Sequence, residues 1–381
     1  MRPIPAIGAG LWMLCFLSCS RQPPGPSINA RLLEAVQQAN VVVVDSCLRR
    51  GADPNLRDDE GNPLIILALE KNRPELLKVL LDHGVQVDAR RQSGYQSTAL
   101  METALRNDLE AASLLLAKGA GLNLRDSTGD TALHWAAFYG RIELTRLLVE
   151  HGANHQSESG QGTPLEVALW QFHDELAVYL AGVAGARPPG DFIDAVKKGD
   201  VARVSELLKR GADPDQTDET GNPALHLAVS QGIEAVVFLL LKNKANPNAL
   251  NRVGQTALCR AAYFGRTAIA RLLVERGAGV NSAGVRYRYT PLHAAARSGF
   301  AELGRWLIDK GAAVDAQEAV SGYTPLMIAT AYGRRDMVEV LINAGANPQV
   351  KGFDGAALPD LINYASHPEI AKLLENYMLQ R

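Results

Sequence analysis

The stretch Gly129-Asp-Thr-Ala-Leu-His-Trp-Ala-Ala-Phe-Tyr-Gly-Arg-Ile-Glu-Leu-Thr-Arg-Leu-Leu-Val-Glu-His-Gly-Ala-Asn154 decides the fold, because it recurs in degenerate copies along most of the chain. Its apolar residues follow helical spacing twice, once from Leu133 and again from Ile142. Thr131 can cap the first of these helices, and Gly152 can end the second. Two helices of about ten residues cannot bury their apolar faces alone, so the copies must stack on one another.

A helix end of the Gly-Ala type recurs at a nearly fixed period. Most of these ends are spaced by 33 to 35 residues, and the spacing from Gly185 to Gly211 is 26. The short interval indicates a boundary between two blocks of repeats. Lys244 stands where the pattern has glycine, and we expect Asn243 to take the left-handed conformation there instead, since asparagine tolerates it better.

The quoted stretch resembles the ankyrin repeat. That family has the motif Gly-x-Thr-Pro-Leu-His-x-Ala, which is matched here by Gly129, Thr131, Ala132, Leu133, His134 and Ala136. It also has the motif Gly-Ala-Asp-x-Asn, which is matched by Gly152, Ala153 and Asn154. The resemblance covers roughly residues 28–379. It implies an all-α solenoid of stacked helix-turn-helix units with β-hairpin-like fingers, in two tandem blocks. It also implies that the motif histidines, His134, His226 and His293, hydrogen-bond neighbouring backbone and steady the fingers.

Five segments are predicted along the chain. They are a signal peptide of the lipoprotein type at 1–18, a flexible tether at 19–27, a first ankyrin block at 28–184, a Pro/Gly joint at 185–190 and a second ankyrin block with a C-terminal cap at 191–381. Each block opens with a half-repeat that lacks the motif segment. Pro188 and Pro189 make the joint stiff and non-helical. Whether the blocks stack continuously across it or hinge there stays open.

The predicted localisation depends on the leader, which is the signal peptide predicted at 1–18. Its apolar run from Ile4 to Leu17 is shorter than the about 20 residues that span a membrane, and it fits a secretory signal peptide. The box Phe16-Leu-Ser-Cys19 resembles a bacterial lipoprotein cleavage site, which implies lipidation of Cys19. Arg21 differs from the aspartate that retains such proteins in the inner membrane, so we expect a periplasmic protein anchored to the outer membrane. The alternatives are ordinary cleavage and an uncleaved anchor.

The sequence disfavours several classes of function. The formal net charge is only −2, which gives no basic footprint for nucleic acid. The motif histidines project from different repeats, so they do not converge as metal ligands. Cys47 and Cys259 fall at core-type helix positions and are interpreted as buried hydrophobes rather than a disulfide. We find no phosphate loop, His-Glu-x-x-His or Gly-x-Ser-x-Gly motif. We therefore expect no enzymatic activity, no metal and no cofactor.

A protein partner is the remaining expectation. In ankyrin proteins such contacts come from the fingers and from the concave side of the first helix, and here aromatics gather at the matching places although they make up 6% of the chain. The predicted partner-binding residues are Phe138, Tyr139, Trp170, Gln171, Tyr263, Phe264, Arg286, Tyr287, Arg288, Tyr289, Arg297 and Tyr332. The alternative for the rings is that they pack on the next repeat.

The finger before Thr290 is a special case of that prediction. Alternating residues of a hairpin point to opposite faces, so Arg286 and Arg288 would share one face and Tyr287 and Tyr289 the other. Two arginines on one face favour an acidic or carboxylate-bearing partner. Taken together, the sequence predicts a protein–protein interaction scaffold or adaptor in the bacterial periplasm. The alternative is a dedicated inhibitor or immunity protein that blocks a toxic enzyme.

Overall fold

The computed structural model describes residues 27–185, 190–362 and 367–379, and within them the protein is built from paired α-helices. The predicted all-α architecture is confirmed. The predicted signal peptide 1–18, the tether 19–27 except for Ser27, and the prolines of the joint 185–190 lie outside the described residues. Contacts divide the chain into two compact units, Met1–Gly94 and Tyr95–Arg381. No helix in the described ranges is long and apolar enough to cross a membrane.

The first unit contains two helical pairs. Its helices are α1 (Ile28–Gln37), α2 (Val41–Arg49), α3 (Leu64–Glu70) and α4 (Pro74–Asp82). Asn40 begins α2 by accepting a hydrogen bond from the Val43 N–H at 3.2 Å. The first helix of each pair is called the inner helix below, and α3 is more buried than its partner α4. In α3 every residue from Leu64 to Leu69 is buried, because both faces of an inner helix meet neighbouring helices.

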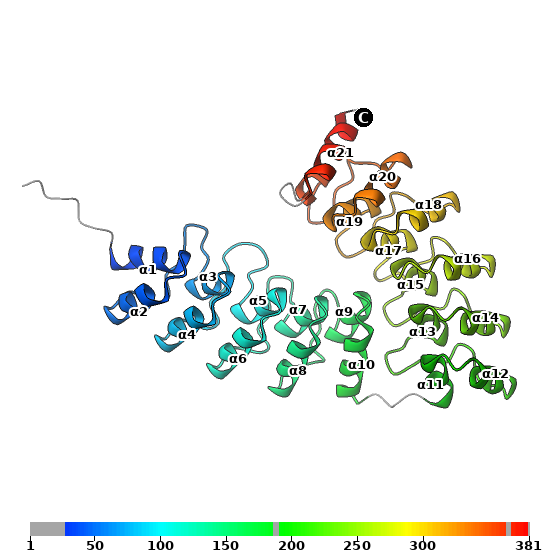
Figure 1. The fold of residues 1–381 in the computed structure, drawn as a ribbon, viewed down its shortest axis with the longest axis horizontal. Helices are drawn as coiled ribbons and strands as arrows, with labels where there is room; N and C mark the ends of the chain where they lie inside the picture. The colour runs from blue at the N-terminus through cyan, green and yellow to red at the C-terminus, as the bar shows by residue number, and fades with distance from the viewer. Residues whose placement is uncertain (1–26, 186–189, 363–366, 380–381) are drawn as a thin grey trace, which may run out of the picture. The chain divides into compact units, whose positions relative to one another are not determined.

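The second unit continues the pairs, with α5, α7 and α9 side by side in one row and α6, α8 and α10 in another (Figure 1). The pairs before the predicted joint are α5 (Ala99–Arg106), α6 (Leu109–Ala117), α7 (Ala132–Phe138), α8 (Ile142–Glu150), α9 (Pro164–Trp170) and α10 (Asp174–Val183). Beyond the joint lie α11 (Asp191–Lys198), α12 (Val201–Lys209), α13 (Ala224–Gln231), α14 (Glu234–Lys242), α15 (Ala257–Tyr263), α16 (Thr267–Glu275), α17 (Pro291–Ser298), α18 (Ala301–Asp309), α19 (Pro325–Ala331) and α20 (Arg335–Asn343). The chain closes with the short 3-10 helix η1 (Leu358–Leu361) and with α21 (Pro368–Leu379).

Threonines begin most inner helices of the second unit. At α9, Thr163 Oγ1 accepts from the Glu166 N–H at 3.3 Å, and Glu166 Oε2 accepts from the Thr163 N–H at 3.1 Å. This reciprocal pair satisfies two amide groups that have no partner within the helix. Pro164 occupies the first helical position, where its missing N–H costs nothing.

Small residues let neighbouring inner helices approach closely. Ala136 and Ala137 in α7, and Ala261 and Ala262 in α15, have no exposed surface. One hydrophobic cluster extends through the second unit from Ala137 to the last helix. The repeats are therefore held by a continuous core, as stacked units that cannot bury their faces alone require.

The motif histidines hold the fingers, as the resemblance implied. His134 Nε2 lies 3.0 Å from the Gly162 carbonyl oxygen of the next finger, while its Nδ1 accepts from the Thr131 N–H. His226 and His293 contact the Gln255 and Tyr323 carbonyl oxygens in the same way, at 2.9 and 3.2 Å. The fingers themselves are turns, and some carry a single antiparallel bridge such as the one from Leu250 to Thr256. The structural interpretation of these histidines is confirmed.

The expectation for Asn243 was wrong. Lys244 itself takes the left-handed conformation with φ of 66°, and Asn243 has φ of −93°. The reason is a hydrogen bond at the end of α14. In its observed conformation Asn243 donates from Nδ2 to the Leu239 carbonyl oxygen, at a distance of 2.8 Å. The Lys244 N–H meanwhile donates to Leu241, as the helix-ending glycines do elsewhere.

The predicted joint does not separate the two compact units. The α11 helix begins at Asp191 with Gly190 as its N-cap, where the second half-repeat was expected. The boundary between the units falls after Gly94. Full repeats are counted from α3–α4, the pair after the opening half-repeat, so α7–α8 is the third repeat and α9–α10 the fourth. The fourth repeat belongs to the same unit as α11–α20.

Candidate partner-binding site

The fourth repeat contacts α15 and α17, which lie well beyond its neighbour in sequence, α11. Phe172, just after α9, stacks on Tyr263 of α15 with ring centroids 4.0 Å apart and an interplanar angle of 8°. Trp170 stacks on Tyr287 of the finger before α17, at 5.8 Å and 24°. Three of the predicted partner-binding rings, Trp170, Tyr263 and Tyr287, are therefore engaged in contacts within the chain.

Polar contacts support this packing. The Tyr287 hydroxyl donates to the Gln161 carbonyl oxygen at 2.7 Å, and Arg286 Nη1 lies 3.0 Å from Glu166 Oε2. Arg297 donates to the Gln171 side-chain oxygen. Burial raises the pKa of Tyr287 to about 12. The finger before α17 is thus fastened to the fourth repeat by hydrogen bonds as well as by rings.

The remaining predicted residues have different surroundings. Tyr287 and Tyr289 are buried whereas Arg286 and Arg288 are exposed, so the expected division of faces is present, although the segment is a turn with Arg288 at φ of 49°. Gln171 is buried, and Phe264 is half-buried with its ring against Phe172. Tyr332 keeps 42% of its surface exposed, under the Arg297 guanidinium. The rings of Phe138 and Tyr139 line a pocket, described next.

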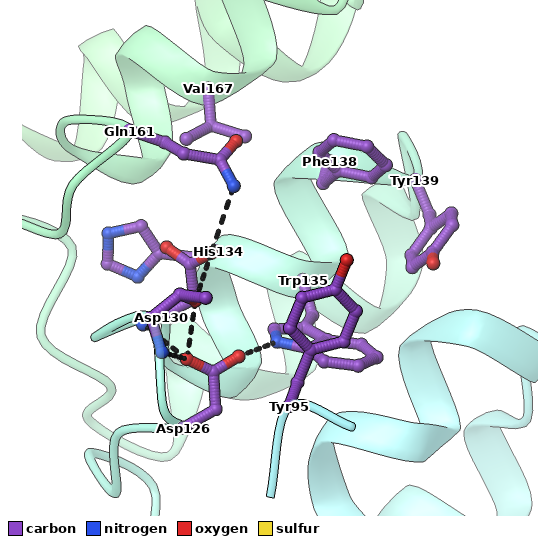
Figure 2. A pocket seen from close by; sticks show the side chains of 10 residues that line it. Tyr95, Asp126, Asp130, His134, Trp135, Phe138, Tyr139, Gln161 and Val167 are labelled. Atoms are coloured by element: carbon purple, nitrogen blue, oxygen red, sulfur yellow. Dashed lines mark hydrogen bonds between the residues drawn. The ribbon is translucent and has the colours of Figure 1, made fainter. Parts of the chain in front are cut away.

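A pocket of about 130 Å³ lies on the inner-helix side of the third repeat, α7–α8. Figure 2 shows its aromatic side, formed by Tyr95, Trp135, Phe138 and Tyr139. The rings of Trp135 and Tyr95 are nearly perpendicular, with centroids 5.9 Å apart, and the Tyr139 ring centroid lies 6.3 Å from that of Trp135. Tyr95 is 60% exposed, so the aromatic side opens to solvent.

The opposite side of the pocket is polar and acidic. Asp126 Oδ2 accepts from the Trp135 indole N–H at 2.8 Å, and Asp126 Oδ1 accepts from the backbone N–H groups of Thr128 and Asp130 (Figure 2). Gln161 Nε2 reaches from the next finger to Asp130 Oδ2 at 3.2 Å. The tight finger turn that follows Asp126 therefore places the Asp126 carboxylate against an indole ring whose orientation is fixed, and the Asp130 carboxylate lines the same pocket.

Asp130 carries an unbalanced charge. Its side chain is buried, and its Oδ1 has no hydrogen-bond partner among the described residues. Burial raises the pKa of the Asp130 carboxyl above its usual range, and the charge of Asp126 raises it further. Burial lowers the pKa of His134, which is therefore neutral at pH 7 and supplies no compensating cation.

The histidine of the pocket is not placed to act as a general base. Both nitrogens of His134 are occupied by the finger backbone and Thr131, so the ring is not free to take a proton from a nucleophile. Within the described ranges no cluster of His, Cys, Asp and Glu could hold a metal ion. Rings beside carboxylates provide instead a surface for recognition.

A second cavity of about 250 Å³ adjoins the first and shares Tyr95, Phe138 and Gln161 with it. Its far wall includes Tyr323, Tyr332 and Asp354 from the last repeats. The two cavities together form a groove, called the aromatic groove below, that extends beyond a single side-chain pocket.

Sequence reasoning missed Tyr95, Trp135, Asp126, Asp130 and Gln161. Trp135 occupies the variable place of the Leu-His-x-Ala motif, and an aromatic there is a local signal that could have been used. Tyr95 lies in the finger of the preceding repeat, and its approach to Trp135 follows only from the stacking. The acidic fingertip residues resemble those of other fingers, and only the structure shows that these two face rings.

Comparison with known proteins agrees with the stacked helical pairs and histidine-held fingers. A family model described as ankyrin repeats (3 copies) matches residues 32–126, 100–188, 192–284 and 283–352. The chain belongs to the ankyrin-repeat family, a family of protein-interaction modules.

Several curated relatives match over parts of the chain. A putative ankyrin repeat-containing protein of Treponema pallidum (strain Nichols) is 33% identical over 42% of this chain and 53% of its own length. The NF-kappa-B inhibitor cactus of Drosophila melanogaster is 31% identical over 35% of this chain and 26% of its own length. Palmitoyltransferase AKR1 of Lachancea kluyveri is 29% identical over 36% of this chain and 19% of its own length. The chain thus spans about half or less of each relative.

Proposed function

We propose that this protein is a scaffold or adaptor that binds a protein partner through the aromatic groove and has no chemistry of its own. The observation that carries the proposal is the cluster of Tyr95, Trp135, Phe138 and Tyr139 around an open pocket. Exposed tyrosine and tryptophan rings on a rigid scaffold supply contact area at low entropic cost, and they dominate many interfaces.

Internal contacts favour this groove over the rest of the predicted site. Trp170, Tyr263 and Tyr287 are held by stacking within the chain, whereas Tyr95 and Tyr332 are 60% and 42% exposed. A partner gains most where apolar rings are still in contact with water.

We further propose that the protein acts at the bacterial envelope. The basis is the leader alone, which resembles a lipoprotein signal ending at Cys19. On this proposal a lipid at Cys19 holds the repeats in the periplasm, at the outer membrane. A dedicated inhibitor of a toxic enzyme is the alternative, and its mark would be a captured partner whose enzymatic activity the complex abolishes.

Affinity capture from envelope extracts of the native host tests the proposal. The bait is the chain from Gln22 onward, compared with the double variant Tyr95→Ala and Tyr139→Ala. Phe238→Ala is the matched control, because Phe238 is a 44% exposed ring on the outer helix α14. We expect one stoichiometric partner that is retained by the control and lost from the double variant. A partner that the double variant retains would exclude the groove.

A further inference from the structure

The pocket of the third repeat has features that identify the chemistry of its occupant. Resting on the proposed protein-binding function, we propose that it receives the ammonium group of a lysine side chain, free or methylated, presented by the protein partner. The reasons are an uncompensated negative charge, aromatic walls that attract cations, and a groove that accommodates the residues beside the lysine.

The negative charge has no counter-charge of its own. Asp126 and Asp130 are both less than 10% exposed, and within the described ranges they accept hydrogen bonds from neutral donors and form no ion pair. The nearest arginine along the finger, Arg125, donates to the Glu158 carbonyl oxygen and to Ser157 Oγ at 2.9 Å. A buried carboxylate without a cation is costly, so a bound ammonium group would relieve the cost of Asp130.

The aromatic walls select a cation over a neutral group. A cation placed over the face of tryptophan or tyrosine is attracted by the negative face of the ring. Trp135 is held in place by Asp126, so this ring is already oriented before a ligand arrives. Tyr139 already attracts one cation of the chain, since the Arg141 guanidinium lies 5.9 Å from its ring centroid.

Size and surroundings exclude other occupants. A cavity of about 130 Å³ exceeds the about 30 Å³ of one water and admits an ammonium head with attached carbons. Phosphate and carboxylate groups would be repelled by Asp126 and Asp130. A bare metal ion would find no ligand cluster among the described residues.

The neighbouring part of the groove favours a protein as the source of the ammonium group. Tyr95 and Phe138 belong to both cavities, and the second offers about 250 Å³ beside the first. Arg297 lines that second cavity, where it would oppose another cation. Glu318 and Asp354 line it as well, where they would oppose an anion, so one lysine in the pocket with uncharged residues next to it fits both cavities.

The test uses the full chain labelled with 5-fluorotryptophan and observed by fluorine NMR. The probes are Nα-acetyl-lysine amide, its trimethylated form, and the neutral Nα-acetyl-norleucine amide. Trp135→Phe assigns the Trp135 signal. We expect the two cationic probes to shift that signal saturably and the neutral probe to leave it unchanged, with Trp306, which lies on the outer helix α18, unaffected.

Two variants test the charge and the rings separately. Asp130→Asn and Tyr95→Ala should each weaken binding of the trimethylated probe by at least about tenfold, while Phe238→Ala leaves it unchanged. Thermal denaturation of each variant checks that the repeats are intact. Equal binding of the neutral probe, an unmoved Trp135 signal or full affinity in Asp130→Asn would overturn the inference.

The outcomes separate this inference from the proposed function. A captured partner that is lost with Tyr95→Ala but kept by Asp130→Asn would leave the groove as a protein site and remove the lysine. Probe binding without a captured partner would leave the ammonium pocket and remove the protein-scaffold proposal. Phosphatidylcholine vesicles are a further arm, and binding to them that needs Tyr95, without binding of the lysine probes, would overturn the protein source.

Discussion

Arg260 of α15 and Asp174 of α10 form two hydrogen bonds, of 2.7 and 2.8 Å, although 86 residues separate them. The Arg260 side chain is fully buried, and Asp174 is 34% exposed. Ser230 Oγ accepts a further hydrogen bond from Arg260 Nη1 at 2.7 Å. This ion pair holds α10 against α15.

The two members of this pair should differ in their sensitivity to replacement. Asp174→Asn leaves a buried guanidinium without its anion, and we expect a loss of about 2 kcal/mol or more in unfolding free energy. Arg260→Met leaves a carboxylate that water already reaches, so its cost should be smaller. Urea denaturation measures both.

The control for that comparison is the exposed pair Arg203 and Asp191, whose side chains are 38% and 84% exposed. Arg203→Met should change the unfolding free energy by less than about 1 kcal/mol. A larger loss in Arg260→Met than in Asp174→Asn would contradict the argument from burial.

Acid should destabilise the repeats through their buried histidines. Burial lowers the pKa of His226 to about 3 and that of His293 to about 4, from an ordinary value of 6.5. The unfolded chain therefore binds more protons than the folded one below pH 6.5, and stability is lost as the pH falls from there toward 4 and below. Each histidine adds up to about 1.4 kcal/mol per pH unit to the slope of the unfolding free energy against pH.

Equilibrium unfolding between pH 4 and pH 7 checks this dependence. His293→Gln should make the unfolding free energy depend less steeply on pH, even if it lowers the unfolding free energy at pH 7. Asp130 contributes with the opposite sign, because its raised pKa makes the folded state bind the extra proton. Asp130→Asn should therefore steepen the net loss of stability on acidification. An unchanged profile in both variants would show that other groups dominate.

Lys244 offers a site for stabilisation. Its φ of 66° strains a residue that carries a side chain, and a glycine there relieves the strain. We expect Lys244→Gly to raise the unfolding free energy by about 1 kcal/mol, measured by thermal or urea denaturation. Gly277→Ala, one repeat further along at φ of 93°, is the reciprocal variant and should destabilise the protein by a similar amount. A destabilised Lys244→Gly would indicate that the lysine side chain has a role of its own.

The leader gives a prediction about the mature protein. If Cys19 receives a lipid, a labelled fatty acid should enter the protein in its native host and Cys19→Ser should abolish the incorporation. Mass spectrometry of the mature N-terminus distinguishes the alternatives. A soluble form cut at another residue indicates an ordinary signal peptide, and an intact leader indicates an uncleaved anchor.

The sequence predicted most of the local structure because each ankyrin repeat carries its own signals. Threonine caps, paired alanines and terminal glycines recur at fixed places, and each acts on residues within one repeat or its neighbour. The contact of Trp170 with Tyr287 could not be predicted in this way, since it joins repeats that are not adjacent in the chain. The pocket was missed for a related reason, because Tyr95 and Gln161 approach Trp135 and Asp130 from the repeats on either side.

The stacking of Phe172 on Tyr263 also limits which ligands can use the inner side of α15. An external protein that needs this side competes with a segment of the same chain, which is present at a fixed effective concentration. Its observed affinity is its intrinsic affinity multiplied by the fraction of molecules in which Phe172 has left Tyr263. The fourth repeat therefore acts as a tethered competitor, and substitutions such as Asp174→Asn would increase binding to α15 while they decrease stability.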